Sequence, residues 1–537
     1  MFFRANMSTG DWIISIFLGL ATYAASNIIY NLYLHPLAHF PGPRLWQCSY
    51  LPRFRAGVKG ELEASIKAFH ERYGAVVRYS PGELSFTAPA AWRDIYGFRE
   101  HALVKDPSFY GLIHLSRDRS HSIFTADGDQ HPRVRKALSY AFSERALRDQ
   151  EPYVTKYVDL LMLRLRELAT PSESSSSSGG AGALVDLVEW YNFTTFDIIG
   201  ELAIAQSFGC LRGSRYHEWV RGFWDVIKLG AFVRALAVST NAAFPQLLRA
   251  LAPRSLKDAR RRHLEYVGRS TERRLNEGEL REKPDFISYV LASGREDQQQ
   301  QQQDGKSGGG AAVLTAGEVE ANANFLLLAG TETTATALAG TTYYLLTNRP
   351  ALRRAIDEVR GAFPRGGDGD DAAITFATAA ADRLPYLQAC LTEGLRLYPP
   401  GPIAAPRRTA PGKVTMIAGH AVPGGVTVGV HAWSASHSAD NFHLASEFHP
   451  ERWLASSSSP SEFAGDRTAA AQPFSYGPRN CLGKPFAYSE MRVILARMLW
   501  NFDMELSPES EGWEKQKVYT LWDKGPLMVK LSARDGK

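Results

Sequence analysis

The chain has 537 residues, of which 45% are hydrophobic and 22% charged, and it contains only 4 cysteines. Such a composition can bury a large core without covalent cross-links, so it excludes a disordered protein, a collagen-like repeat and a disulfide scaffold. The net charge is +5, and the basic residues are dispersed along the chain, so nucleic-acid binding is not expected. The cysteines are far apart and show no C-x-x-C spacing, which argues against zinc and thioredoxin-like motifs: Cys48, Cys210, Cys390 and Cys481.

Residues 12–34, WIISIFLGLATYAASNIIYNLYL, are long and apolar enough for a helix that crosses a bilayer. A cleaved signal peptide is the alternative, because 23–26 offers small residues, but the apolar run continues past that site to Leu34. Only Arg4 precedes the span, whereas four basic residues follow it closely: Arg44, Arg53, Arg55 and Lys59. Positive-inside bias therefore places the bulk of the chain in the cytosol, which agrees with unpaired cysteines in a reducing compartment.

Length alone suggests three or four domains, although one large fold also fits. We predict four segments: a short lumenal N-terminus over 1–11, a transmembrane anchor over 12–34, a Pro-rich hinge over 35–44 and one globular domain over 45–537. Low-complexity stretches are predicted to be surface loops, because they have too few apolar groups to offset the entropy of ordering: 171–183, 297–312, 365–371 and 455–460.

Amphipathic patterns predict helices over 152–168 and 184–208, whereas strand signals are short and cluster in 75–87 and 414–430. Thr315 and Glu318 form a capping-box pattern, which starts a helix that should run to about Asn348. The middle of this helix, AGTETT over 329–334, combines a glycine with poor helix formers. An ordinary surface turn is one interpretation, but the apolar flanks favour a buried, functional break in the helix.

The strongest signal lies over 474–483, FSYGPRNCLG. A lone cysteine is usually a small buried hydrophobe. Here Cys481 follows a loop rich in turn residues and precedes an apolar helix expected over 485–500, with Arg479 close by. A helix N-terminus and an arginine both favour thiolate over thiol. A thiolate held in a shielded loop is what an axial ligand of haem iron requires.

This pattern, F-x-x-G-x-R-x-C-x-G, resembles the haem-binding loop of the cytochrome P-450 family. Glu393 and Arg396 resemble the E-x-x-R motif of that family, whose spacing puts an acid and a base on one helix face. The segment PERW over 450–453 resembles a family segment whose arginine, here Arg452, completes an ion-paired triad; solvated surface salt bridges are the alternative for each pair. The resemblance covers essentially the whole chain and implies a mainly α fold with small β-sheets, a single large domain preceded by one transmembrane helix.

The resemblance implies haem b as the cofactor, with Cys481 as the axial ligand of the iron and Phe474 packed beside the sulfur to exclude water. Glu332 and Thr333 match the acid-alcohol pair of the oxygen-activation groove, where a local helix break accepts O₂ and the pair delivers protons. Three arginines match donors to the haem propionates: Arg479, Arg407 and Arg135. His131 stands where the family often has tryptophan in W-x-x-x-R, and it is a candidate propionate contact.

Four regions match substrate contacts of the family: 110–124, 325–329, 403–405 and 520–522. The residues singled out in them are Phe325, Ala329, Ile403, Ala404, Ala405 and Leu521. The middle two regions are small and apolar, which favours a hydrophobic, polycyclic or terpenoid-like molecule. The inserts and the LRLYPPGP and PERW segments resemble filamentous-fungal microsomal members, many of which tailor secondary metabolites.

The implied activity is that of an NADPH- and O₂-dependent monooxygenase, which puts one oxygen atom into the substrate and releases the other as water. The implied partners are a flavoprotein NADPH-cytochrome reductase, cytochrome b5, a hydrophobic small molecule and the endoplasmic reticulum membrane. Desaturation or ring cleavage by the same chemistry stays open. A haem-thiolate isomerase or dehydratase and a non-enzymatic haem sensor are further alternatives, against which the retained Glu332 and Thr333 pair argues.

Overall fold

The computed structural model describes residues 9–98, 103–111, 113, 115–170, 182–239, 254–278, 284–303, 313–364, 371–454 and 461–534. Helices of the N-terminal part are α1 (Thr9–Ile29), continued by a π-helix (Tyr30–Leu34), α2 (Arg44–Cys48), α3 (Leu51–Lys59), α4 (Leu62–Tyr73), α5 (Pro89–Tyr96) and α6 (Pro107–Tyr110). The helices of the main body are α7 (Gln130–Ser139), α8 (Glu144–Ala169), α9 (Leu187–Ile204), α10 (Cys210–Gly213), α11 (Glu218–Ser239), α13 (Arg254–Asn276), α14 (Phe286–Gln303), α15 (Ala316–Thr347), α16 (Arg349–Ala362), α17 (Pro385–Leu397), α18 (Ala432–Ser436) and α19 (Lys484–Asn501).

The strands form small sheets. One sheet has the order β1 (Val76–Ser80), β2 (Glu83–Phe86), β8 (Thr427–Val430), β5 (Arg407–Arg408) and β3 (Val104–Lys105), and within it β2 and β8 run parallel. A second has the order β4 (Ala183–Asp186), β12 (Met528–Ala533) and β9 (Phe502–Leu506), and two hairpins pair β6 (Thr415–Ile417) with β7 (His420–Val422) and β10 (Lys517–Val518) with β11 (Trp522–Asp523). The predicted strand clusters in 75–87 and 414–430 are confirmed.

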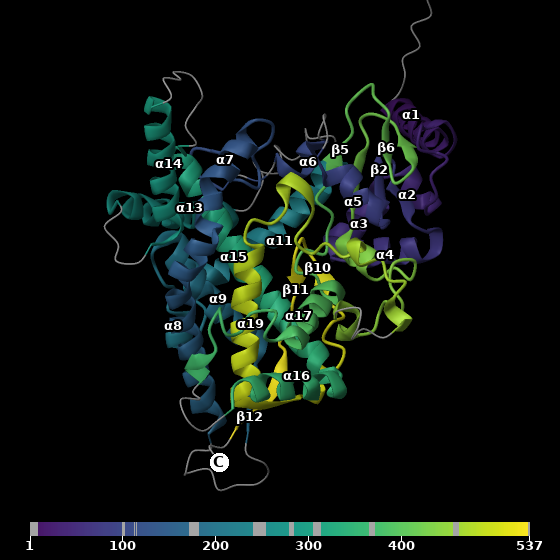
Figure 1. The fold of residues 1–537 in the computed structure, drawn as a ribbon. Coiled ribbons are helices and arrows are strands. Elements are labelled where there is room, and N and C mark those ends of the chain that lie inside the picture. The colour runs from purple at the N-terminus through teal and green to yellow at the C-terminus, as the bar shows by residue number, and fades with distance from the viewer. Residues whose placement is uncertain are drawn as a thin grey trace, which may run out of the picture.

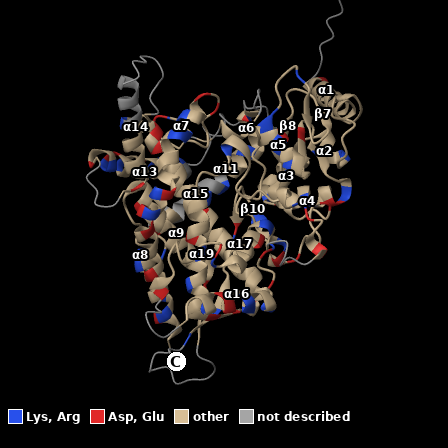
Figure 2. Cartoon of the chain, viewed as in Figure 1, with Lys and Arg blue, Asp and Glu red and all other residues tan. Residues whose placement is uncertain are grey.

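Helix α15 lies in the middle of the helical body and packs against α9, α13, α17 and α19 (Figure 1). Its side chains are buried on nearly all sides, as expected for a helix at the centre of a large core. The sheet that contains β2 and β5 lies to the right in Figure 1, beside α2 to α5, with α1 at the outer edge. Figure 2 shows acidic and basic residues interspersed along the helices.

The capping box predicted for α15 is confirmed, because Thr315 accepts from the amide of Glu318 while Glu318 accepts from the amide of Thr315. The predicted break over 329–334 is wrong, because the helix is continuous. Gly330 has a packing role instead, since a Cβ atom there would overlap the side chain of Ile199 on α9. The hydroxyls of Thr331 and Thr333 donate to carbonyls one turn earlier in the same helix, so their hydrogen-bonding capacity is satisfied without a break.

One low-complexity prediction is partly wrong. Helix α14 continues to Gln303 and so includes the glutamine run that was expected to be a loop. Glutamine is a good helix former, so an existing helix can extend through such a run at little cost. The other expected loops fall mostly outside the described residues, at 171–181, 304–312, 365–370 and 455–460.

The segment Thr9–Leu34 is apolar and long enough to cross a bilayer, with a mean hydropathy of 1.7. None of its residues is buried in the rest of the protein. The hinge that follows is bound to the globular part. The amide of Arg78 donates to the carbonyl of Pro41 over 2.8 Å, and the Arg78 guanidinium donates to the carbonyl of Asn31 over 2.8 Å. The end of the apolar helix is therefore bonded to strand β1.

Candidate functional site

Cys481 ends a tight loop just before α19. Ser475 and Gly477 adopt positive φ angles of 60° and 74°, and a Cβ atom on Gly477 would overlap the carbonyl of Tyr96, so this position requires glycine. The amide of Cys481 donates to the carbonyl of Phe474 over 2.8 Å, which closes the loop. The Cys481 residue is exposed, so its sulfur is open to a ligand on one face.

The charge state of Cys481 reflects opposing effects. Burial raises the pKa of the thiol, while the amides of Gly483 and Lys484 and the positive charge of Arg135 lower it. The amides before α19 and the nearby positive charges therefore act in the predicted direction, but the burial effect outweighs them and the net pKa of the thiol is raised. A coordinated metal ion deprotonates such a thiol directly, which the loop by itself does not do.

Five basic side chains converge beside the Cys481 loop: Lys105, His131, Arg135, Arg407 and Arg479. Burial and the neighbouring arginines lower the pKa of His131 to about 3 and that of Lys105 to about 7. Asp127, which pairs with Arg479, also lies here. The mutual repulsion of these groups indicates a site for additional negative charge.

Arg135 and Arg407 are held by neutral partners, whereas Arg479 has a neutral partner in addition to its ion pair with Asp127. Arg135 donates to the carbonyl and the side-chain oxygen of Asn480 over 2.8 and 2.7 Å, which joins α7 to the cysteine loop. Arg407 donates to the Tyr110 hydroxyl over 3.1 Å, and Arg479 donates to the carbonyl of Ala126 over 3.1 Å. The predicted propionate donors thus lie together on one side of Cys481.

A haem fits this donor set. The described residues contain no group of three or more His, Cys, Asp or Glu side chains able to hold a metal ion, so a metal here would depend on Cys481 with its open face. The excess of cations suits a group that carries two carboxylates, because paired guanidinium groups bind carboxylates strongly. His131 and Lys105 add to this cluster, and sequence reasoning missed Lys105 because it lies on a two-residue strand.

Glu332 and Thr333 are adjacent on α15 but differ in their contacts. Glu332 is fully buried and forms an ion pair with Lys524, which follows β11, while the Thr336 hydroxyl donates to the same carboxylate over 3.0 Å. The second carboxylate oxygen of Glu332, Oε2, has no hydrogen-bond partner among the described residues. The Thr333 hydroxyl is only partly buried and donates to the carbonyl of Ala329 over 2.5 Å.

A second buried acid lies beside α15, and sequence reasoning missed it. Glu490 of α19 is 1% exposed and contacts Thr334, and its Oε2 atom has no partner among the described residues. Burial raises the pKa of Glu490 to about 8, so this carboxyl is neutral at pH 7. In the sequence, the feature that could have indicated this buried acid is a single Glu in an apolar helix, two residues before Arg492.

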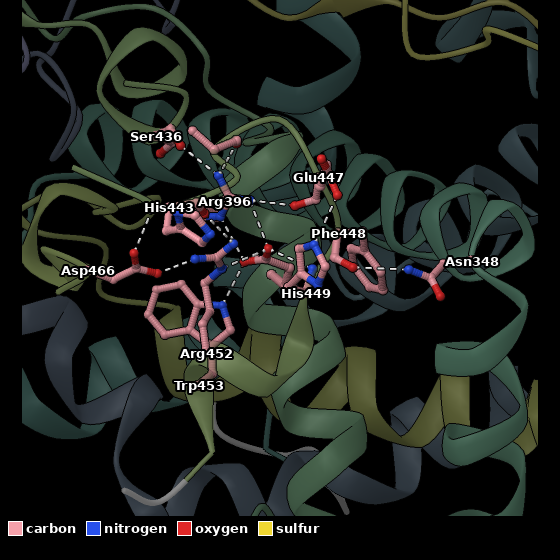
Figure 3. Close-up of polar contacts among 12 residues, drawn as sticks. Asn348, Arg396, Ser436, His443, Glu447, Phe448, His449, Arg452, Trp453 and Asp466 are labelled. Carbon is pink, nitrogen blue, oxygen red and sulfur yellow. Dashed lines mark hydrogen bonds and ion pairs between the residues drawn. The ribbon is translucent and has the colours of Figure 1, made fainter. Parts of the chain in front are cut away.

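Glu393, Arg396 and Arg452 form a fully buried cluster. Figure 3 shows its two arginines with the residues around them. Arg396 donates twice to Glu393, over 2.7 Å each, and Arg452 Nε donates to Glu393 over 3.0 Å. Burial raises the pKa of Glu393, but the two arginines outweigh this effect and bring that pKa below its ordinary value. Trp453 Nε1 and the amide of His449 also donate to this carboxylate, so the surface salt-bridge alternative is wrong.

The predicted substrate residues separate into two groups. Ile403 and Ala404 line a cavity of about 110 Å³, and Phe325 stacks on Phe124 with ring centroids 5.1 Å apart. Ala329, Ala405 and Leu521 are partly buried but do not line that cavity. Trp522, inside the predicted 520–522 region, belongs to the core, because it is 1% exposed and stacks on Tyr398.

Comparison with known proteins decides the family. The family model for cytochrome P450 matches residues 40–531. The chain belongs to the cytochrome P450 family. This P450 is 41% identical over 513 residues to the trichothecene C-4 hydroxylase of Trichoderma arundinaceum, covering 95% of this chain and 94% of that protein. It is 41% identical over 515 residues to the cytochrome P450 monooxygenase astJ of Aspergillus oryzae, covering 95% and 94%, and 38% identical over 519 residues to the averantin hydroxylase of Dothistroma septosporum, covering 96% and 90%.

As a P450, the chain is a haem-thiolate oxidoreductase that receives electrons from NADPH through a reductase. The predicted mainly α fold with small sheets is confirmed.

Proposed function

We propose that this P450 hydroxylates a hydrophobic small molecule of secondary metabolism. It is similar over nearly its whole length to fungal proteins that are named hydroxylases and monooxygenases. The observation that carries the proposal is the juxtaposition, along α15, of a buried carboxyl at Glu332 with a partly buried hydroxyl at Thr333. A protein that only carries or senses haem needs no such pair.

In this proposal the haem, when bound, supplies the oxygen chemistry, and the chain holds it. Cys481 would bind the iron, and Phe474, whose carbonyl closes the loop, would shield the sulfur from water. The basic cluster holds the propionates through Arg135, Arg407 and Arg479, with His131 as a neutral neighbour. The excess positive charge of the cluster supports this assignment.

The proton-handling residues are proposed to be Glu332 and Thr333. Glu332 Oε2 is buried without a hydrogen-bond partner, so it can hold a proton at that atom. Thr333 Oγ1 can exchange its bond to the Ala329 carbonyl for a bond to a bound oxygen-containing group. Because the Lys524 ion pair holds the Glu332 carboxylate, delivery from Glu332 requires this ion pair to rearrange.

We also propose a single-pass location in the endoplasmic reticulum membrane, with residues 1–11 in the lumen, 12–34 as the anchor, 35–44 as the hinge and 45–537 as the cytosolic catalytic domain. Support comes from the apolar helix and from the basic residues after it. The exposed side chains of Lys136 and Lys484, close to the cysteine loop, suit an acidic reductase surface and, as a second donor, cytochrome b5.

The proposal is tested with full-length protein in microsomes together with a reductase. The reduced protein should give the carbon monoxide difference spectrum of a thiolate ligand, and Cys481→Ala should abolish it. NADPH- and O₂-dependent products that are 16 mass units heavier than the substrate support hydroxylation, whereas products 2 units lighter point to desaturation. Products formed without NADPH would contradict the proposal and favour an isomerase or dehydratase.

A further inference from the structure

The 110 Å³ cavity has charged walls that an apolar substrate does not need. It lies among α3, α4, α6, α11 and the β10–β11 hairpin, and Ile403 and Ala404 form part of it. Two arginines and two glutamates line it: Arg53, Glu63, Glu83 and Arg234. The sequence predicted only a small apolar contact region here, at 403–405, and did not predict these charged side chains.

Two of these charges balance each other. Arg53 donates to Glu83 over 3.0 Å, and Glu83 also accepts from the hydroxyls of Tyr79 and Ser80 over 3.2 and 2.7 Å. This carboxylate therefore has an arginine and two neutral donors of its own. His431, also in the wall, is neutral, because burial lowers its pKa to about 3.

Arg234 on α11 has no acidic partner among the side chains that the structure describes, which do not include those of 218 and 221–227 on the same helix. It donates to the hydroxyl of Thr520, and its guanidinium lies over the ring of Phe109 at 4.9 Å from the centroid. The neighbouring part of the chain that the structure does not describe, 240–253, contains no Asp or Glu. Burial and the charge of Arg53 lower the pKa of Arg234 to about 10, so it stays charged at pH 7 and leaves the cavity with one uncompensated cation.

Glu63 supplies a further polar group in the same wall, and its Oε2 atom lies 3.9 Å from Nε2 of His431. It is 4% exposed, and its Oε2 atom has no hydrogen-bond partner among the described residues. Burial raises the pKa of Glu63 to about 8, while Arg53 lowers it, so the carboxyl is protonated at pH 7. A protonated carboxyl donates a hydrogen bond.

We propose that this cavity is a subsite for a carboxylate on an otherwise apolar substrate, with Arg234 pairing with the carboxylate and Glu63 donating a second hydrogen bond to it. A single uncompensated cation suits a singly charged group better than a phosphate ester, which carries more charge. The apolar part of the substrate then extends past Ile403 and Ala404. This inference rests on the proposed function, because it narrows the substrate to an amphipathic carboxylic acid.

The test measures binding of dodecanoate and of methyl dodecanoate to the full-length holoprotein by equilibrium dialysis at pH 7. The two probes share one apolar chain and differ in charge. We expect wild type to bind dodecanoate more tightly than the ester, and Arg234→Gln to lower dodecanoate affinity about 10- to 100-fold without changing ester affinity. The carbon monoxide spectrum and thermal unfolding of each variant establish that it is folded.

Lys228→Gln is the matched control, because Lys228 lies on the same helix, loses the same charge and pairs with Asp523 outside the cavity wall. It should leave dodecanoate binding within about twofold of wild type, as expected for an exposed pair. Glu63→Gln keeps a neutral donor of similar shape, so the preference for dodecanoate should persist. Loss of that preference in Glu63→Gln would overturn the role given to Glu63.

The subsite is overturned if wild type shows no preference for dodecanoate over the ester, including the case in which neither binds. It is also overturned if Arg234→Gln weakens both probes equally, or if Lys228→Gln weakens dodecanoate as much as Arg234→Gln does. Dialysis needs no electrons, so failure of hydroxylation with an intact carboxylate preference would contradict the proposed function alone.

Discussion

The ammonium group of Lys524 and the carboxylate of Glu332 form an ion pair in the core, and both bond to the Thr336 hydroxyl, over 2.6 Å from Lys524 and 3.0 Å to Glu332. Both side chains are almost fully buried. Removing one partner of such a pair leaves the other charge without compensation in a medium of low dielectric constant. The acid proposed for proton delivery is thus held by a residue near the C-terminus of the chain.

Lys524→Met is expected to lower the free energy of unfolding by about 3–5 kcal/mol, because it leaves Glu332 buried and unpaired. The ferric holoprotein can be followed by thermal unfolding. The double variant with Glu332→Gln should lose less than the sum of the two single variants, by about 0.5–3 kcal/mol. Lys228→Met, which removes an exposed pair, should cost less than about 1 kcal/mol. Additive losses in the double variant would contradict direct coupling of the two groups.

Thr333→Ala is expected to keep the carbon monoxide spectrum but to divert NADPH electrons into hydrogen peroxide. Product per NADPH should fall roughly tenfold or more, since general acid catalysis contributes about 10²–10⁴-fold. Thr331→Ala is the matched control, because Thr331 makes the same kind of bond to a helix carbonyl, over 2.7 Å to Leu327, but is fully buried. Equal uncoupling in both variants would show that helix geometry, not the Thr333 hydroxyl, is responsible.

Glu393→Gln should destabilise the protein by about 3–5 kcal/mol and lower the fraction that retains haem after purification. The variant would remove the negative charge that Arg396 and Arg452 share, and both arginines are fully buried. Haem content per protein and thermal unfolding measure the two effects. Glu447→Gln, at an exposed acid paired with His449, is the control and should change stability by less than about 1 kcal/mol. A normal haem content and stability in Glu393→Gln would refute a structural role for this cluster.

Glu490→Gln should stabilise the protein increasingly as pH rises. The folded pKa of Glu490 is about 8 and its ordinary value is 4.5. Between these values the unfolded chain loses its proton and the folded chain keeps it, so the wild-type free energy of unfolding falls by up to about 1.4 kcal/mol per pH unit relative to the glutamine variant. Below about pH 4.5 this difference vanishes.

The difference in unfolding temperature between Glu490→Gln and wild type, measured at several values from pH 5 to 8, tests this prediction. Glu509→Gln, at an exposed acid on the surface, is the control and should give a difference that does not change with pH. A constant difference for Glu490→Gln as well would mean that Glu490 is ionised in the folded state throughout.

Local patterns predicted the features that depend on near neighbours. The cysteine loop, the capping box at Thr315 and the i, i+3 spacing of Glu393 and Arg396 each lie within a few residues, and the structure has each as expected. Composition predicts a loop for the glutamine run in α14, but the high helix propensity of glutamine continues the helix through it.

The features that were not predicted depend on contacts between distant residues. From the sequence, Gly330 is expected to break the helix, but in the structure it makes room for Ile199. Lys524 lies 192 residues from Glu332, with which it pairs. Arg234 and Glu63 reach one cavity from separate helices. No pattern in a single sequence shows which buried charges meet, because that depends on the packing of elements far apart in the chain.

The β10–β11 hairpin and the residue that follows it make contacts both at the cavity and at Glu332. Its Thr520, with a positive φ of 91°, bonds to Arg234 beside the cavity, and a short distance along the chain Lys524 holds Glu332. One short ribbon therefore links molecular recognition to proton supply. A substitution in the hairpin that re-aims Thr520 also moves Lys524, so substrate preference and the yield of product per electron should change together when this ribbon is altered.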